Sequence, residues 1–135
     1  MSDDGLITIP SPHPVGQTID RLSGAATAAG LRIFVRVDHR LGAQEVGMPM
    51  RATELLIFGN PTGGTPLMQD RQTVGIDLPL KALAWEDEEG RVWLTYNDPA
   101  WVARRHGLSS DAQASVAAIA RGLASVAAKA TEADP

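Results

Sequence analysis

The sequence predicts an α+β fold, in which one mostly antiparallel sheet of about five strands is covered by helices. Three features of the 135-residue chain lead to this prediction. Short apolar runs alternate with turn residues, two of these runs flank the hairpin-type turn at residues 87–90, and two long segments repeat apolar residues at helical spacing. The expected order, β-α-β-(α)-β-(α)-β-β-α-α, lacks the strict alternation of a doubly wound parallel sheet.

The first segment of the chain predicts a strand followed by a helix. Residues 6–9 form a short apolar run that Pro10 closes, because proline cannot donate to a strand ladder. A helix should begin near Pro14, since proline suits the first helical turn, and should end at Gly30, where a left-handed C-cap belongs. Its buried face is expected to carry Val15, Ile19, Leu22 and Ala26.

Two strands and two short helices are expected in the middle of the chain. Residues 31–38 alternate between apolar and polar side chains, which predicts a half-buried strand. Its expected buried side consists of Leu31, Ile33, Val35 and Val37. Residues 52–58 contain the most apolar run and predict a central strand covered on both faces. Short helices are expected near residues 41–46 and 67–70, the second capped by Asn60 or Thr65.

The C-terminal part predicts a hairpin and two helices. The hairpin strands are expected at residues 80–85 and 92–96. Asp98 as N-cap, Pro99 at the first helical position and Gly107 as the stop predict the first helix. Ser110 and Gln113 match a capping box before an alanine-rich helix over residues 111–129.

The chain divides into one domain and a C-terminal extension. We expect residues 5–108 to form the α+β domain and residues 109–130 to form a helix packed on that domain or on a dimer partner. Residues 131–135 are expected to fray, because chain ends are poorly ordered unless they are tied down.

Composition and charge exclude several classes of protein. A formal net charge of −4 with scattered charges argues against a nucleic-acid partner, because such proteins carry a basic stripe. The absence of cysteine excludes disulfides and zinc–thiolate sites and fits a reducing cytoplasm. The sequence shows no signal-peptide pattern and no apolar stretch of about 18 residues. We therefore expect a cytoplasmic protein with no membrane partner and no cofactor.

Several short motifs occur along the chain in a fixed order. They are Val37-Asp38-His39, Thr53-Glu54-Leu55, Phe58-Gly59-Asn60-Pro61, Gly64-Thr65-Pro66-Leu67-Met68, Asp77-Leu78-Pro79-Leu80 and Tyr96-Asn97-Asp98-Pro99. Together they resemble the domain-of-unknown-function 302 family over about residues 5–108. The resemblance implies a small α+β fold with an antiparallel sheet, a homodimer, and no established activity or catalytic residues. It also implies that the family pattern includes His39, Glu54, Asn60, Thr65 and Asp77.

The segment from Gly59 to Thr65 is the candidate ligand site. Glycines between a strand and a helix allow backbone amides to approach an anion, so we expect Gly59, Asn60, Gly64 and Thr65 to contact a small polar or anionic ligand. The segment lacks the lysine that a nucleotide-binding P-loop requires. The alternative is a tight connection in which Gly and Asn-Pro only form turns.

His39 is the candidate acid–base residue, because an imidazole titrates near neutral pH. Glu54 or Asp77 would orient it, and we expect these side chains to gather with the Gly59–Thr65 segment at the carboxyl end of the central strand. The alternative is that His39 only caps a strand end. No metal site is expected, because the three histidines lack the i, i+4 spacing of helical ligands.

The sequence is therefore consistent with three alternative functions. The first is a homodimeric domain that binds a small polar molecule, the second is an enzyme that uses His39 with Glu54 or Asp77, and the third is a structural or interaction module without a small-molecule site. Clustered aromatic residues predict a core or a dimer interface, with a stacking platform for a flat ligand as the alternative. These residues are Trp85, Trp93, Tyr96 and Trp101.

Overall fold

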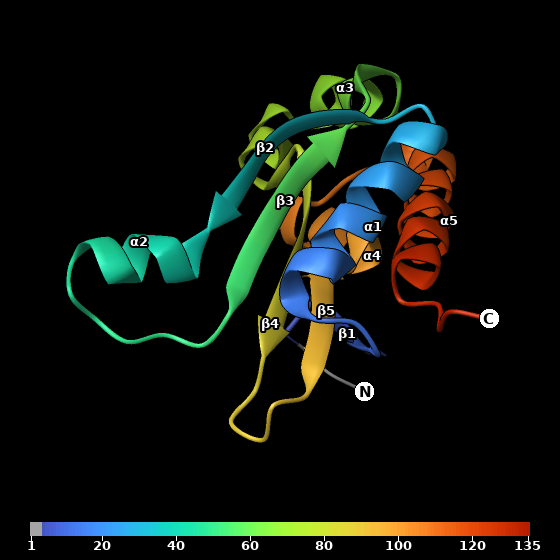
Figure 1. The fold of residues 1–135 in the computed structure, drawn as a ribbon. Helices are drawn as coiled ribbons and strands as arrows, with labels where there is room; N and C mark the ends of the chain where they lie inside the picture. The colour runs from blue at the N-terminus through green and yellow to red at the C-terminus, as the bar shows by residue number, and fades with distance from the viewer. Residues whose placement is uncertain (1–3) are drawn as a thin grey trace.

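The computed structural model describes residues 4–135 as a single sheet with helices packed against it (Figure 1). Residues 1–3, which contribute to the expectation about a signal peptide, lie outside the described part. The strands are β1 (Leu6–Ser11), β2 (Arg32–Asp38), β3 (Thr53–Gly59), β4 (Leu80–Glu86) and β5 (Val92–Asn97). The helices are α1 (Val15–Ala28), α2 (His39–Glu45), α3 (Pro61–Asp70), α4 (Pro99–His106) and α5 (Gln113–Ala130), with 3₁₀ turns η1 (Gln72–Asp77) and η2 (Ser110–Ala112).

The sheet has the order β1-β5-β4-β3-β2, and every neighbouring pair is antiparallel. This confirms the predicted α+β class and the five strands. The β4–β5 hairpin turns where expected: the Asp87 carboxylate accepts hydrogen bonds from the backbone N–H groups of Glu89 and Arg91, both at 2.9 Å, and Gly90 has a φ of 80°. Only glycine adopts such a φ without steric cost, so the turn is fixed by local chemistry.

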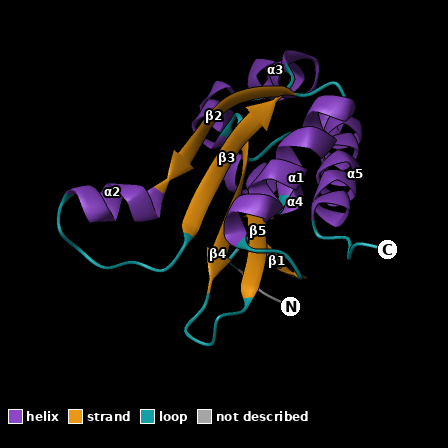
Figure 2. Ribbon diagram, viewed as in Figure 1, coloured by secondary structure: helices purple, strands orange, loops and turns teal. Residues whose placement is uncertain are grey.

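Helices α1 and α5 pack against one face of the sheet (Figure 2). The predicted face of α1 is buried there, and α5 contributes Leu123, Val126, Ala127 and Ala130 to the same core. The strands contribute Leu56, Phe58, Ala82, Ala84, Leu94 and Tyr96. Helix α5 contacts α1, α3 and α4 and therefore packs within its own chain.

The opposite face of the sheet is only half-buried, which corrects one prediction. The apolar run of β3 was expected to be covered on both faces. Leu56 and Phe58 are buried under the helices, whereas Leu55 and Ile57 on the other face remain partly exposed. An antiparallel sheet tolerates one open face, and an apolar run in the sequence does not reveal which faces have a partner.

The prediction that Leu31, Ile33, Val35 and Val37 share one buried side of the second strand is also wrong. Ile33 pairs with Phe58, but the register shifts by one residue before Val35 pairs with Ile57. Such a β-bulge places Ile33 and Val35 on opposite faces of the sheet. Val35 and Val37 therefore lie on the open face, and Phe34 is exposed.

Helix α2 and residues 46–50 extend away from the rest of the molecule (Figure 1), and Arg51 and Ala52 rejoin the sheet through hydrogen bonds with the backbone of Glu86. The Asp38 carboxylate caps α2 by accepting from the backbone N–H of Leu41 at 2.9 Å. No residue of α2 is buried, and Leu41, Val46, Met48 and Met50 are all exposed. This segment, residues 39–50, is called the arm below.

The helix ends near the C-terminus follow the sequence signals in part. Asp98 caps α4 through the backbone N–H of Ala100 at 3.0 Å, and Gly107 ends the helix at a φ of 63°, as predicted. The capping box is wrong: Ser110 opens the 3₁₀ turn η2, and α5 begins at Gln113 without a side-chain cap. Among the described residues, no helix is long and apolar enough to cross a membrane.

Candidate functional site

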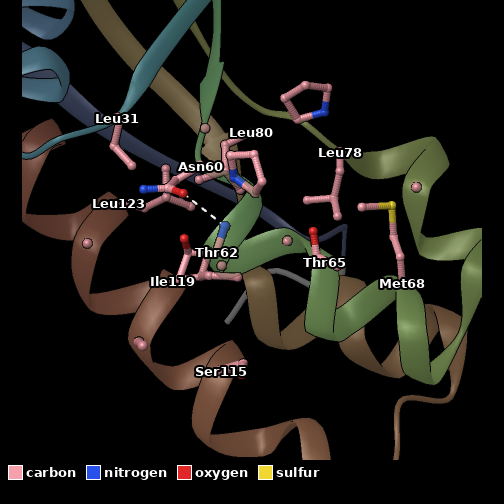
Figure 3. Close-up of a pocket in the computed structure, with 18 of the residues that line it drawn as sticks. Leu31, Asn60, Thr62, Thr65, Met68, Leu78, Leu80, Ser115, Ile119 and Leu123 are labelled. Atoms are coloured by element: carbon pink, nitrogen blue, oxygen red, sulfur yellow. Dashed lines mark hydrogen bonds between the residues drawn. The ribbon is translucent and has the colours of Figure 1, made fainter.

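A pocket of about 630 Å³ opens at the carboxyl end of β3, between α3, α5 and the start of β4. Figure 3 shows Leu31, Ile119 and Leu123 on one side of it and Leu78 and Met68 on the other, with the first turns of α3 between them. Pockets of roughly 300–1,000 Å³ typically hold small molecules, so this pocket is large enough for a ligand.

The candidate segment lines this pocket, but its conformation differs from the prediction. Gly59, Asn60, Gly64 and Thr65 all contribute to the wall. The expected glycine-rich loop is instead the start of α3, which begins at Pro61 and is capped by Asn60 Oδ1 accepting from the backbone N–H of Thr62 at 2.8 Å.

Helix α3 forms despite its glycines and an internal proline, which are poor helix formers. Asparagine at the N-cap and proline at the first position favour the start of the helix. Leu67 anchors the helix in a second core that contains Val74, Ala103 and Val116. Tertiary packing thus outweighs low helix propensity.

The walls of the pocket are apolar, so the predicted polar pocket is wrong. Among residues 4–135, no Asp, Glu, Lys, Arg or His side chain lines it. Most of its side chains belong to leucine, isoleucine, alanine and proline residues, together with Phe34 and Met68, and its polar side chains belong to Asn60, Thr62, Thr65 and Ser115. An anion would find no charge partner in these walls, and burial of an unpaired charge is costly.

Several glycines determine the width of the pocket. A Cβ on Gly64 would lie in van der Waals contact with Leu78 at 3.4 Å, and a Cβ on Gly75 would crowd the Met68 sulfur at 3.3 Å. A Cβ on Gly122 would meet nothing within 4 Å. A glycine inside a helix costs roughly 0.5–1 kcal/mol relative to alanine, and here it leaves space in the pocket.

His39 and Glu54 lie at the other end of β3, away from the pocket. His39 is the exposed first residue of α2, and its side chain makes no hydrogen bond or ion pair with another described residue. Glu54 Oε1 accepts from Arg36 Nε at 2.7 Å, and Arg36 also reaches Asp20 and the Gly16 carbonyl. The hydrogen bonds that Arg36 donates to Asp20 and Glu54 raise the pKa of Arg36. This cluster ties α1 to β2 and β3.

Asp77 is also absent from the pocket wall and binds different partners from those expected. Its Oδ2 lies 2.6 Å from His106 Nε2, and both carboxylate oxygens lie 3.1 Å from Arg105 Nη1. A carboxylate only accepts, so His106 Nε2 carries the proton. His106 Nδ1 lies 3.3 Å from the Thr73 hydroxyl. This group links η1 to the end of α4.

The structure therefore does not gather the predicted set. His39 and Glu54 lie near the far end of β3 without a bond between them, Asp77 binds His106 and Arg105, and only Asn60 and Thr65 share the pocket with the glycines. The histidine–carboxylate pair that does exist, His106 with Asp77, was not predicted, because 29 residues separate the two and no local spacing relates them. Within residues 4–135, no group of three or more His, Asp or Glu side chains is placed to hold a metal ion.

The fold and the pocket define a class of protein: a small α+β domain with one covered sheet face and an apolar pocket at the sheet end. The sequence profile of "Domain of unknown function DUF302" matches residues 7–126. The chain belongs to this family, and the match extends beyond residue 108 into α5.

One solved structure has the same fold. It is described as "Crystal structure of uncharacterized conserved protein DUF302 from Bacillus stearothermophilus" and superposes with a TM-score of 0.83 at 18% identity. The superposition covers 94% of this chain and 98% of that protein.

Curated relatives with higher identity carry the name of an ion channel. The chain is 51% identical over 124 residues to "Fluoride-specific ion channel FluC 1" of Brucella suis biovar 1 (strain 1330), and the match covers 92% of this chain and 49% of that protein. The protein of the same name from Brucella abortus biovar 1 (strain 9-941) matches at the same identity over 46% of its length. The chain thus spans about half the length of the curated relatives it matches.

Proposed function

We propose that this chain is a cytoplasmic, homodimeric domain that binds a small molecule in the pocket at the carboxyl end of β3. The observation that carries the proposal is the pocket itself, about 630 Å³ in volume and lined by Gly59, Asn60, Gly64 and Thr65. Apolar walls with a few polar groups are typical of ligand pockets in proteins. The geometry gives the enzyme hypothesis less support, because His39 has no carboxylate partner among the described residues.

The open sheet face and the arm support the homodimer. The face presents partly exposed apolar side chains from β2 to β5: Val35, Val37, Leu55, Ile57, Leu83, Trp85 and Trp93. The arm adds Val46 and Met48, whose exposed fractions are 70% and 62%. A stable interface uses roughly 20–30 residues on each side, a number that the face and the arm together can supply.

Native mass spectrometry, compared with the denatured mass, tests both parts of the proposal. We expect freshly purified protein to have twice the mass of one chain and to carry a dissociable small-molecule adduct. A dimer without an adduct would support the interaction-module hypothesis instead. A monomer at every accessible concentration would refute the homodimer.

A charge in the arm tests where the subunits meet. Met48→Glu should produce a monomer, because a carboxylate would be buried in an apolar interface. Ile76→Glu is the matched control: Ile76 is 74% exposed and lies outside the face and the arm, so this variant should remain a dimer. If both variants stay dimeric, the arm is not part of the interface.

A second candidate function comes from the curated relatives. We infer that the chain acts as an accessory domain of a fluoride channel. The 51% identity to about half the length of proteins named fluoride-specific ion channels supports this inference. The test is a chimera in which this chain replaces the matched half of the Brucella suis protein, assayed by fluoride efflux from liposomes. Efflux should resemble that of the full-length relative and differ from that of the relative lacking this half. Equal efflux from chimera and truncated protein would refute this role.

A further inference from the structure

We propose that the pocket accepts an uncharged, predominantly apolar small molecule that carries one hydrogen-bonding group. The inference rests on the small-molecule-binding function proposed above and specifies the ligand class for the same pocket.

The first argument is the absence of a charge partner in the pocket wall. The lining residues include no acidic or basic side chain. A charged ligand group placed among Leu78, Ile119 and Leu123 would lose its hydration without compensation. Two cations lie near the lining without belonging to it: Lys81 Nζ donates to the Pro79 carbonyl at 3.4 Å, and the Arg32 guanidinium lies 6.0 Å from the Phe34 ring centroid.

The second argument is a small set of polar groups without protein partners. Asn60 Oδ1 accepts from the backbone N–H of Thr62, which leaves the Asn60 side-chain N–H groups as donors. The hydroxyls of Thr65 and Ser115 make no hydrogen bond with any described residue. These groups suit a carbonyl, amide or hydroxyl on a ligand whose remainder is apolar.

The third argument is the space beside α5. Gly122 lines the pocket, and a Cβ there would touch nothing within 4 Å. The Cβ of a leucine at this position would therefore displace no protein atom, and leucine is a good helix former. Gly122→Leu is thus expected to narrow the pocket while preserving the helix.

The experiment compares matched neutral and charged probes by isothermal titration calorimetry at pH 7. Two pairs are used, 2-naphthamide with 2-naphthoate and octanamide with octanoate, so that each pair shares one apolar skeleton. We expect the amide of at least one pair to bind at least tenfold more tightly than its carboxylate. Carboxylates are ionised at this pH, so the difference reports the burial of charge.

The variants locate the binding site. Gly122→Leu should weaken amide binding at least tenfold, and Gly24→Leu should leave it unchanged. Gly24 is the matched control because it is an exposed glycine inside α1, its Cβ would also meet nothing within 4 Å, and it does not line the pocket. Thermal melts confirm that each variant is folded, and Gly122→Ala, which adds one methyl group, replaces Gly122→Leu if the latter unfolds.

Each outcome supports or overturns a defined part of the proposal. Carboxylates that bind as tightly as the amides, or more tightly, would overturn the ligand class but leave the binding function standing. Amide binding that survives in the pocket-narrowing variant would overturn the assignment of the ligand to this pocket. Failure of all four probes to bind wild-type protein up to their solubility limits would overturn both the ligand class and the proposed binding function.

Discussion

Substitution of Asp77 by alanine should destabilise the protein by about 2 kcal/mol. Its Oδ2 accepts from His106 Nε2 at 2.6 Å, and the His106 side chain is only 8% exposed. Removal of the acceptor leaves an almost buried N–H without a partner, which costs about 1–3 kcal/mol. The Arg105 pair adds little, about 0–1 kcal/mol, because the Arg105 side chain is 50% exposed and solvent screens the interaction.

The assay is equilibrium unfolding in urea, followed by the fluorescence of the three tryptophans. The midpoint should fall while the m-value stays constant, because the change in exposed surface on unfolding is the same. Arg105→Gln is the control and should cost no more than about 0.5 kcal/mol.

A double substitution tests whether the buried pair is the cause. Asp77→Ala combined with His106→Ala should cost less than the sum of the single effects, since each single change already breaks the same contact. A loss below about 0.5 kcal/mol for Asp77→Ala, or an equal loss for Arg105→Gln, would refute the reasoning.

Three further predictions concern residues outside the pocket. His39→Ala should change the free energy of unfolding by no more than about 0.5 kcal/mol, because its side chain is exposed and makes no hydrogen bond with a described residue. A larger loss of stability in urea unfolding would show a structural role. Glu54→Gln should cost about 1 kcal/mol in the same assay, because it weakens the charge-assisted bond from Arg36, and an unchanged midpoint would contradict this. The hydrogen bond from Trp93 Nε1 lowers the pKa of Asp87, so this carboxylate should stabilise the hairpin above about pH 4 and lose that effect at lower pH. The Tm difference between wild type and Asp87→Ala should therefore shrink as the pH falls, and a difference that grows would show the opposite sign.

The sequence alone predicted the elements whose signals are local. Asp98, Pro99 and Gly107 set the ends of α4, and Asp87 and Gly90 form the hairpin turn, because caps and turns depend on hydrogen bonds within a few residues. The α+β class followed from the order of such elements. Gly59, Asn60, Gly64 and Thr65 lie at or just after the carboxyl end of β3, and all four line the pocket; that they bind a ligand stays a prediction.

Only the tertiary structure decided the chemistry of the site. The wall opposite the predicted segment comes from α5, about 50 residues later in the chain, and its aliphatic side chains contribute to the apolar wall. The β-bulge in β2 places Val35 on the face of the sheet opposite to Ile33, and the helices cover only one face of β3. His106 hydrogen-bonds to Asp77 because η1 and α4 pack together. Register, coverage of a sheet face and long-range contacts depend on how distant segments pack, and local spacing in a sequence does not contain that information.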